Sequence, residues 1–91
     1  MVRPLKQRRI QFDPKILYYK PRGVRLRDLE EVVLSVDEVE ALRVKYVKGL
    51  DQIKCAVNMK VSQSTFQRIL ASTNKKIAEA IISGKAIRIE K

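Results

Sequence analysis

The sequence of 91 residues has no histidine and a single cysteine, Cys55, and these two shortages exclude several kinds of site. One cysteine cannot form an internal disulfide, which is typical of a protein in a reducing compartment. Zinc sites are built mainly from cysteine and histidine side chains, so we expect no metal site and no cofactor. Cys55 itself should belong to the core, because it falls on the inner face of a predicted helix.

Long apolar runs are also absent. Charged residues interrupt every apolar stretch within about six residues, whereas a membrane-spanning helix needs about 20. The first four residues do not open a secretory signal. We therefore expect a cytoplasmic protein with no membrane partner. A chain this short forms one small domain that buries about 60–65% of its surface, which leaves little interior for an enclosed substrate pocket.

Glycine is scarce as well. The sequence has three glycines, and they do not form a phosphate-binding loop. The acidic residues do not form an obvious catalytic pair either. Asp37, Glu38 and Glu40 occupy the first turn of a predicted helix, where negative charge is favoured by the helix dipole. We therefore expect that the protein is not an enzyme.

Positive charge dominates what is present, because 20 lysines and arginines against 10 acidic residues give a net charge of +10. Nine basic residues and one acid in residues 1–27 give +8, and eight basic residues and three acids in residues 51–91 give +5. Six acids and three basic residues make residues 28–50 acidic, at −3. This composition favours an anionic partner. The acidic surface at 28–40 should face away from that partner or contact another protein.

The positions of the prolines and the alternation of polar and apolar residues predict the structure of the two ends of the chain. Three prolines within the first 21 residues favour an extended basic arm over 1–27, followed by a helical domain over 28–91. Alternating polar and apolar residues predict short strands at 9–12 and 86–90. We expect these strands to pair, within one molecule or between two, because neither is stable alone. The tyrosine pair 18–19 is expected to pack on its own domain rather than to stack on bases.

Helical periodicity begins after the arm. Apolar residues at helical spacing predict a short helix over 27–34. Ser35 and Glu38 have the spacing of a capping box, in which each side chain accepts a hydrogen bond from the other residue's backbone amide. They predict the start of a second helix, which should run to Gly49.

Two further helices and a tight turn give the outline of a helix-turn-helix. Asp51 is the predicted cap of a helix over 52–59. Lys60 and Val61 make the turn, and Ser62 caps the next helix. The apolar positions of that helix are Phe66, Ile69, Leu70, Thr73, Ile77, Ala80 and Ile81. The residues expected between the two helices are Cys55, Ala56, Met59, Val61, Phe66 and Ile69.

The outer face of the helix that begins at Ser62 suits base reading in a major groove. Near its N-terminus it carries short or forked hydrogen-bonding side chains, and the free amides there also attract phosphate. The base-reading candidates are Gln63, Ser64, Gln67 and Arg68. The phosphate-contact candidates are Arg3, Lys6, Arg8, Arg9, Lys60, Ser62, Lys75 and Lys76.

Several short segments together form a family pattern. They are Arg3-Pro4, Arg8-Arg9-Ile10, Pro14-Lys15, Lys20-Pro21-Arg22-Gly23, Leu29-Glu30-Glu31-Val32, residues 37–43, Gly49-Leu50, residues 62–70 and Gly84-Lys85-Ala86. In these segments the chain resembles, over nearly its whole length, the short prokaryotic proteins called domain of unknown function 134 or uncharacterised protein family 0251. The resemblance implies a DNA-binding protein whose helix-turn-helix is similar to the promoter-reading fourth region of sigma factors.

Three departures from the family pattern change what we expect. Members often have glycine where this chain has Lys60, so a residue with a side chain must make the turn, under strain if its φ is positive. Many have arginine where Gln63 stands, and glutamine suits adenine instead. The family arm often has cysteines near Gln7 and Gln11, and their absence here leaves no metal site in the arm.

Three hypotheses for function stay open. The first is a mainly α, sigma-region-4-like helix-turn-helix protein that binds double-stranded DNA as a transcriptional regulator. It would act as a homodimer on half-sites about 10 base pairs apart, through the terminal strands or through the helix that carries Ile77 and Ile81. The second is an RNA-binding or ribosome-associated protein, because charge does not distinguish the two nucleic acids. The third is an adaptor whose acidic surface contacts RNA polymerase.

Overall fold

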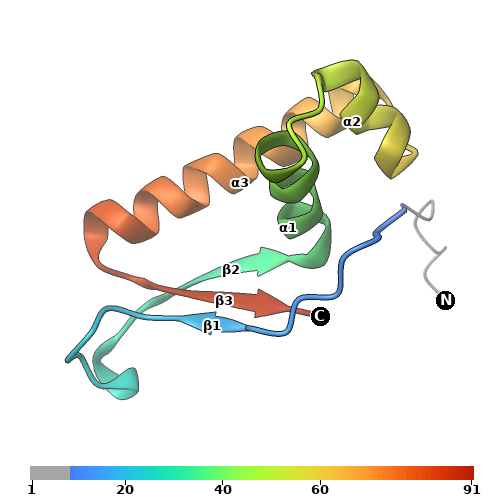
Figure 1. Ribbon diagram of the computed structural model, residues 1–91. Coiled ribbons are helices and arrows are strands. Elements are labelled where there is room, and N and C mark those ends of the chain that lie inside the picture. Colours follow the sequence, from blue (N-terminus) through green and yellow to red (C-terminus); the bar gives the residue numbers. More distant parts are fainter. Residues whose placement is uncertain (1–8) are drawn as a thin grey trace, which may run out of the picture.

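The computed structural model describes residues 9–91, which form a mainly helical fold with a small three-stranded sheet (Figure 1). The strands are β1 (Tyr18–Tyr19), β2 (Glu31–Ser35) and β3 (Ala86–Glu90), and the α-helices are α1 (Val36–Leu42), α2 (Gln52–Met59) and α3 (Gln63–Ser83). A 3-10 turn (Leu26–Asp28) precedes β2, and a π-helical segment (η2, Arg43–Val47) continues α1. None of the helices in this part of the chain is long and apolar enough to cross a membrane.

The C-terminal strand β3 is the centre of the sheet. The strand order is β1-β3-β2, with β3 antiparallel to β1 and parallel to β2. In this register Val32 lies beside Ile87 and Leu34 beside Ile89, so these apolar side chains share one face. Figure 1 shows α3 running across the sheet. The strand predicted at 86–90 is therefore confirmed.

The predicted strand at 9–12 is wrong. Residues 9–12 have no strand structure, and β3 pairs with β1 and β2 instead. The backbone amide of Arg9 donates to Met59 O (3.1 Å), and that of Gln11 donates to a carboxylate oxygen of Glu40 (3.1 Å). Because these amides are bonded to helical residues, they are not available for a strand ladder.

The predicted helix over 27–34 is also wrong, because its second half is strand β2. The spacing of Leu29, Val32, Val33 and Val36 favours a helix, but Val32 and Leu34 are also two residues apart, as on one face of a strand. Both side chains are buried. Pairing along the whole of β3 decides between the two readings, and β-branched residues such as Val32 and Val33 fit a strand well.

Helix α1 begins where the capping box predicts. Ser35 Oγ accepts from the Glu38 amide (3.3 Å), and the Glu38 carboxylate accepts from the Ser35 amide (2.9 Å). The helical path continues through η2 and ends before Gly49, whose positive φ of 73° suits glycine. The expected helix from Ser35 to Gly49 is confirmed, although its last part is π-helical.

Helices α2 and α3 begin at the caps expected from the sequence. Asp51 accepts from the Lys54 amide (2.8 Å), and Ser62 accepts from the Thr65 amide (3.1 Å). The main core cluster lies where α1, η2, α2 and α3 meet. Its buried residues are Ala41, Val44, Cys55, Ala56, Met59 and Phe66, with Leu50, Val61, Ile69 and Leu70 packed against them. The predicted contact between α2 and α3 is thus confirmed, and burial raises the pKa of the Cys55 thiol.

The turn between α2 and α3 depends on Lys60, which has a positive φ and adopts the left-handed conformation (φ 56°, ψ 47°), the strained case that the sequence left open. This conformation costs a residue with a Cβ about 1–2 kcal/mol, of which glycine's extra freedom in the unfolded chain offsets roughly half. We therefore expect Lys60→Gly to raise the free energy of unfolding by about 0.5–1 kcal/mol in urea titrations. Lys60→Ala, which removes the charge but keeps the Cβ, is the control. An equal gain in both variants would contradict the backbone explanation.

Helix α3 has one inner and one outer face. Phe66, Thr73 and Ala80 are buried on the inner face. Ile81 was expected there too, but it is 70% exposed, and its neighbour Ile82 is 84% exposed. The expectation for Ile81 is wrong, because Ala80, seven residues after Thr73, is the buried residue at this end of α3, and Ile81 is turned 100° away from it around the helix.

Candidate nucleic-acid interface

The four base-reading candidates lie together on the outer face of α3. Gln63, Ser64, Gln67 and Arg68 are all exposed, and 100° per residue places them within one side of the helix. Phe66, between them in sequence, is fully buried. The packing of Phe66 therefore determines which way the four polar side chains face.

The N-terminus of α3 is held by hydroxyl groups. Ser62 Oγ accepts from the Thr65 amide and donates to Thr65 Oγ1 (2.9 Å). Thr65 Oγ1 also accepts from an Arg68 guanidinium nitrogen (3.3 Å). The capping role of Ser62 is confirmed. Arg68 keeps most of its five donors for other partners, since this single contact is long.

The lysine candidates divide into two groups. Lys60 and Lys75 are exposed, and the structure records no ion pair for either of them within residues 9–91. Lys76, in contrast, bonds to Glu38 Oε1 and to Val33 O, both at 2.9 Å. The amine of Lys76 is bonded between α3 and the end of β2, whereas the amines of Lys60 and Lys75 have no such bonds recorded within residues 9–91.

Four candidates come from the arm, and three of them, Arg3, Lys6 and Arg8, lie outside the described residues. Arg9 is exposed, and its backbone is bonded to the last residue of α2. The first described residue of the arm therefore lies beside the turn that leads into α3, as Figure 1 shows.

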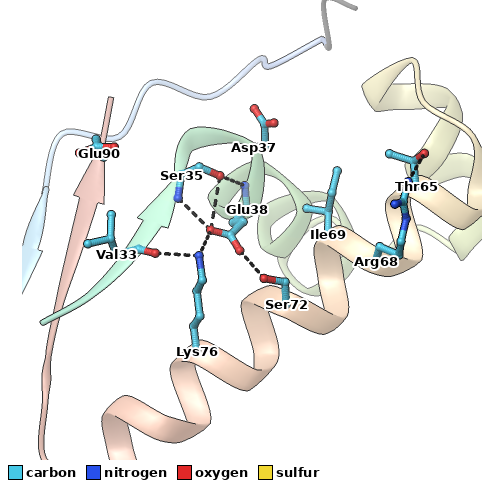
Figure 2. Close-up of a pocket in the computed structure, with 10 residues that line it drawn as sticks. All are labelled: Val33, Ser35, Asp37, Glu38, Thr65, Arg68, Ile69, Ser72, Lys76 and Glu90. Atoms are coloured by element: carbon cyan, nitrogen blue, oxygen red, sulfur yellow. Dashed lines mark hydrogen bonds and ion pairs between the residues drawn. The ribbon is translucent and has the colours of Figure 1, made fainter. Parts of the chain in front are cut away.

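A groove of about 530 Å³ lies between α3 and the β2–α1 corner (Figure 2). Its lining residues are Val33, Ser35, Asp37, Glu38, Thr65, Arg68, Ile69, Ser72, Lys76 and Glu90. Arg68 lies at the border between this groove and the outer face of α3. The groove carries both signs of charge, and within residues 9–91 no three acidic or cysteine side chains are placed to share a metal ion.

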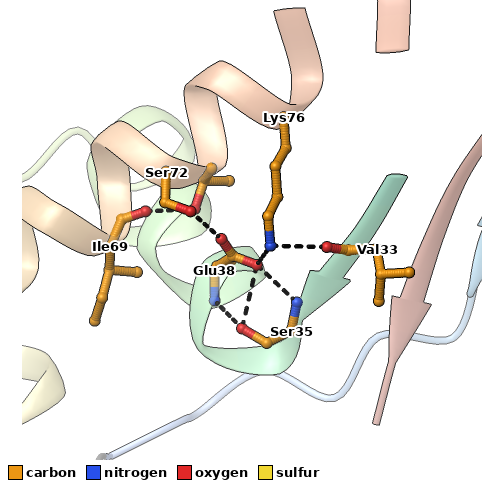
Figure 3. Close-up of polar contacts among 7 residues, drawn as sticks. Val33, Ser35, Glu38, Ile69, Ser72 and Lys76 are labelled. Atoms are coloured by element: carbon orange, nitrogen blue, oxygen red, sulfur yellow. Dashed lines mark hydrogen bonds and ion pairs between the residues drawn. The ribbon is translucent and has the colours of Figure 1, made fainter. Parts of the chain in front are cut away.

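Glu38 connects the groove's walls (Figure 3). Besides capping α1, its carboxylate accepts from Ser72 Oγ and Lys76 Nζ, each at 2.9 Å. Burial alone would raise the pKa of Glu38, but these bonds and that from Ser35 lower it below the ordinary value. The same network uses the Ser35 amide and the Val33 carbonyl, both on the outer edge of β2. It therefore blocks part of the edge that another strand could join.

The acidic surface expected at 28–40 is only partly available, because two of its carboxylates are buried, while the Glu30 side chain is 84% exposed. Glu38 is buried, and so is Glu40, which binds Arg43 through both oxygens (2.8 and 2.9 Å). Glu31 accepts from Arg88 (3.0 Å) and from Tyr18 (2.8 Å) on the polar face of the sheet. These carboxylates stabilise the fold instead of forming a surface for a partner.

The chain matches known proteins over its whole length. The model of the family described as "Protein of unknown function DUF134" matches residues 1–91. The chain belongs to this family. A "UPF0251 protein" of Halothermothrix orenii is 52% identical over 90 residues, and one of Moorella thermoacetica is 53% identical over 90 residues. Both matches cover 99% of this chain. No solved structure gives a significant match.

These relatives are longer than the chain. The chain spans 67% of the Halothermothrix orenii protein, 60% of the Moorella thermoacetica protein and 59% of a relative from Desulforudis audaxviator that is 52% identical. The resemblance expected from the sequence motifs is therefore confirmed as family membership. The names of these relatives assign no activity or ligand.

Sequence reasoning missed the structural roles of Glu40 and Gln11. Both fall in segments that were assigned for other reasons, Glu40 to an acidic surface and Gln11 to a strand. The i, i+3 spacing of Glu40 and Arg43 is a signal for an ion pair within one helix. Nothing in the spacing indicates that this pair also binds the arm, because Gln11 is 29 residues away.

Proposed function

We propose that the protein binds double-stranded DNA through α2, the turn and α3, which together act as a sigma-region-4-like helix-turn-helix, and that it regulates transcription. In this proposal the N-terminal part of α3 enters the major groove. The observation that carries it is the division of α3, whose inner face packs against α2 through Phe66 while Gln63, Gln67 and Arg68 stand exposed on the outside.

The electrostatics of the fold support the same proposal. The acids at 28–40 are used within the fold, by Arg43, Arg88 and Lys76 among others. Arg68, Lys60 and Lys75 are exposed and form no recorded ion pair within residues 9–91, although Lys75 lies one helical turn from Glu79 and within range of its charge. Phosphate contacts are proposed for these exposed lysines, for Ser62 and for the arm, whereas Lys76 is left out because its amine is already bonded.

Substituting Arg68 should separate base reading from general attraction to DNA. We expect Arg68→Ala to cost about 1–3 kcal/mol on the preferred site and to relax preference at one base position. Lys75→Ala, the control farther along the same face, should weaken binding to all sequences about equally. Competition titrations with a panel of duplexes measure both effects. Unchanged affinity of Arg68→Ala on every duplex would show that the groove face is wrongly placed.

Selection of bound sites from random duplex DNA tests the proposal as a whole, with structured RNA as competitor at one fixed salt concentration. We expect a defined consensus and preference for the duplex. A strong preference for RNA would favour the RNA-binding alternative and overturn the proposal. The adaptor alternative has lost its main feature, since the acidic residues on which it depended are largely paired or buried.

A homodimer is part of the proposal, because one such helix rarely discriminates enough sequence alone. Strand β3 has neighbours on both sides, so it offers no free edge to a second copy. Ile81 and Ile82 are large, exposed apolar side chains on the same helix as Arg68, about 20 Å away at 1.5 Å per residue. We therefore propose the C-terminal part of α3 as the contact between copies. Light scattering of the parent and of Ile82→Glu checks it, and an unchanged mass would contradict it.

A further inference from the structure

We propose that Glu40 is a positioning residue that holds the basic arm beside the turn into α3, and so sets where the arm meets DNA. The inference rests on the proposed function and adds to it a defined origin for the arm. No motif in the sequence assigned Glu40 to DNA binding. Its effect would pass entirely through the backbone of residues 9–11.

The arm is bonded to α1 and α2 at successive points. Arg9 N donates to Met59 O at 3.1 Å, and Gln11 N donates to Glu40 Oε2 at 3.1 Å. In the amide orientation that satisfies its neighbours, the Gln11 side chain donates to Asn58 Oδ1 (2.9 Å) and accepts from the Arg9 guanidinium (2.7 Å). These contacts fix residues 9–11 along the end of α2.

Glu40 is well suited to anchor a chain segment. Its side chain is 0% exposed, and Arg43 binds both carboxylate oxygens through two nitrogens, which fixes the orientation of the group. Desolvation raises the pKa of Glu40, but the bonds from Arg43 and Gln11 outweigh it, and the pKa lies below the ordinary value. A charged acceptor at this position makes the bond to Gln11 N stronger than a neutral one would.

The anchor determines where the charge of residues 1–8 is applied. Residue 8 is joined to Arg9, and Arg9 is bonded to the residue that precedes Lys60. Eight residues span at most about 28 Å when extended, which exceeds the roughly 12 Å width of a major groove. Starting beside the turn, Arg3, Lys6 and Arg8 can therefore reach phosphates next to the groove that α3 enters. Without the anchor, residues 9–11 would lose their fixed position along α2, and holding them there on binding would cost more free energy.

A double-mutant cycle on the full chain tests the inference. The variants are Glu40→Met, the triple substitution Arg3→Ala/Lys6→Ala/Arg8→Ala, and their combination. The probe is a random-sequence 24-base-pair duplex titrated at several salt concentrations. The triple variant should reduce the log–log salt slope by about 2–3, at about 0.9 per lost phosphate contact. Glu40→Met alone should weaken binding at least threefold and lower the slope. In the combination, it should add less than twofold to the loss from the triple variant.

Two further variants separate positioning from general stability. Gln11→Pro removes the backbone N–H that donates a hydrogen bond to Glu40, and it leaves the Glu40–Arg43 pair in place. It should reproduce the binding defect of Glu40→Met even if Glu40→Met itself folds poorly. Glu38→Met, on the same helix, breaks contacts to α3 and β2, and Glu38 has no recorded bond to the arm residues that the structure describes, 9–27. Combined with the triple variant, Glu38→Met should weaken DNA binding by the product of the two separate fold-changes, as expected for independent effects.

The outcomes are distinct for the two proposals. If the parent binds the duplex with a steep salt slope but Glu40→Met and Gln11→Pro multiply with the triple variant, the positioning role is overturned and DNA binding stands. If the parent shows no salt-dependent binding to duplex DNA at low salt, the proposed function is wrong and this inference falls with it.

Discussion

Phe66→Ala should lower the free energy of unfolding by about 3–5 kcal/mol, the range for truncating a fully buried aromatic side chain. Among residues 9–91, Phe66 is the largest fully buried residue, and it belongs to the core cluster where α1, α2 and α3 meet. A chain this short has little further core to compensate the loss. Urea titration followed by circular dichroism measures the change, and partial unfolding at room temperature would agree with it.

Ile82→Ala is the matched control for this prediction, because it removes a large apolar side chain from the exposed side of the same helix. At high dilution, where the monomer predominates, its effect on the free energy of unfolding should stay within about 0.5 kcal/mol, and a larger cost is expected only at concentrations where the proposed dimer buries Ile82. A cost comparable to that of Phe66→Ala would mean that Ile82 is buried in solution, as the proposed dimer requires. Repeating the titration at several protein concentrations separates the two cases, since dimer stability depends on concentration.

The α2–α3 unit could be predicted from sequence because its signals are local. The side chains of Asp51 and Ser62 cap their helices by accepting from backbone amides three residues later in the sequence. Phe66 and Thr73 have the spacing of residues on one face of a helix, and both are buried. Lys60 could be assigned to a turn because the caps leave only three residues between the helices. Each of these signals lies within two helical turns of the residue it explains, so no knowledge of the rest of the fold is needed.

Strand β2 could not be predicted in this way. Leu29, Val32 and Val33 have helical spacing, whereas Val32 and Leu34 have strand spacing, and only pairing with β3, more than 50 residues later, decides between them. The same limit applies to the arm. Alternation at Arg9 to Phe12 predicts a strand, but the acceptors of the Arg9 and Gln11 amides, Met59 O and Glu40, come from distant helices.

Sequence predicted the exposure of the candidate side chains better than it predicted which of the charged side chains are unpaired. Gln63 and Arg68 are exposed as helical periodicity requires. Lys76 has the same charge as Lys75, but its position one residue later, 100° around the helix, turns it towards Glu38. Buried pairs of this kind can be seen only when both elements are placed, so charge counts overestimate the number of cations available to DNA.

Two carboxylates of one short helix connect different parts of the molecule. Glu38 binds the sheet edge and α3, whereas Glu40 binds the arm. They are two residues apart, so they leave α1 on nearly opposite sides. Helix α1 thereby fixes α3 relative to the sheet and the arm relative to α3. The acidic segment contributes to DNA binding in this proposal by positioning basic elements.

Glu38→Ala should lower the free energy of unfolding by about 2–3 kcal/mol. Removing one partner of a buried ion pair costs about 3–5 kcal/mol, and we expect less here because the Lys76 side chain is 39% exposed and stays partly hydrated. Glu79→Ala is the matched control, since Glu79 lies on the exposed side of α3 and forms an ion pair with Lys85. This substitution should lower the free energy of unfolding by about 0–1 kcal/mol. Urea titrations at neutral pH compare the two variants.

The pH dependence of the same variants tests the cause of the effect. Because the pKa of Glu38 is lower in the folded state than in the unfolded state, its contribution to stability is fully present at neutral pH. The contribution should be lost progressively as the pH falls below about 4.3, the ordinary pKa of glutamate, towards the folded value. The gap in stability between the parent and Glu38→Ala should therefore narrow in acid. A gap that stays constant from pH 7 to pH 3 would mean that Glu38 acts through packing, and that its charge contributes nothing to holding α3 against the sheet.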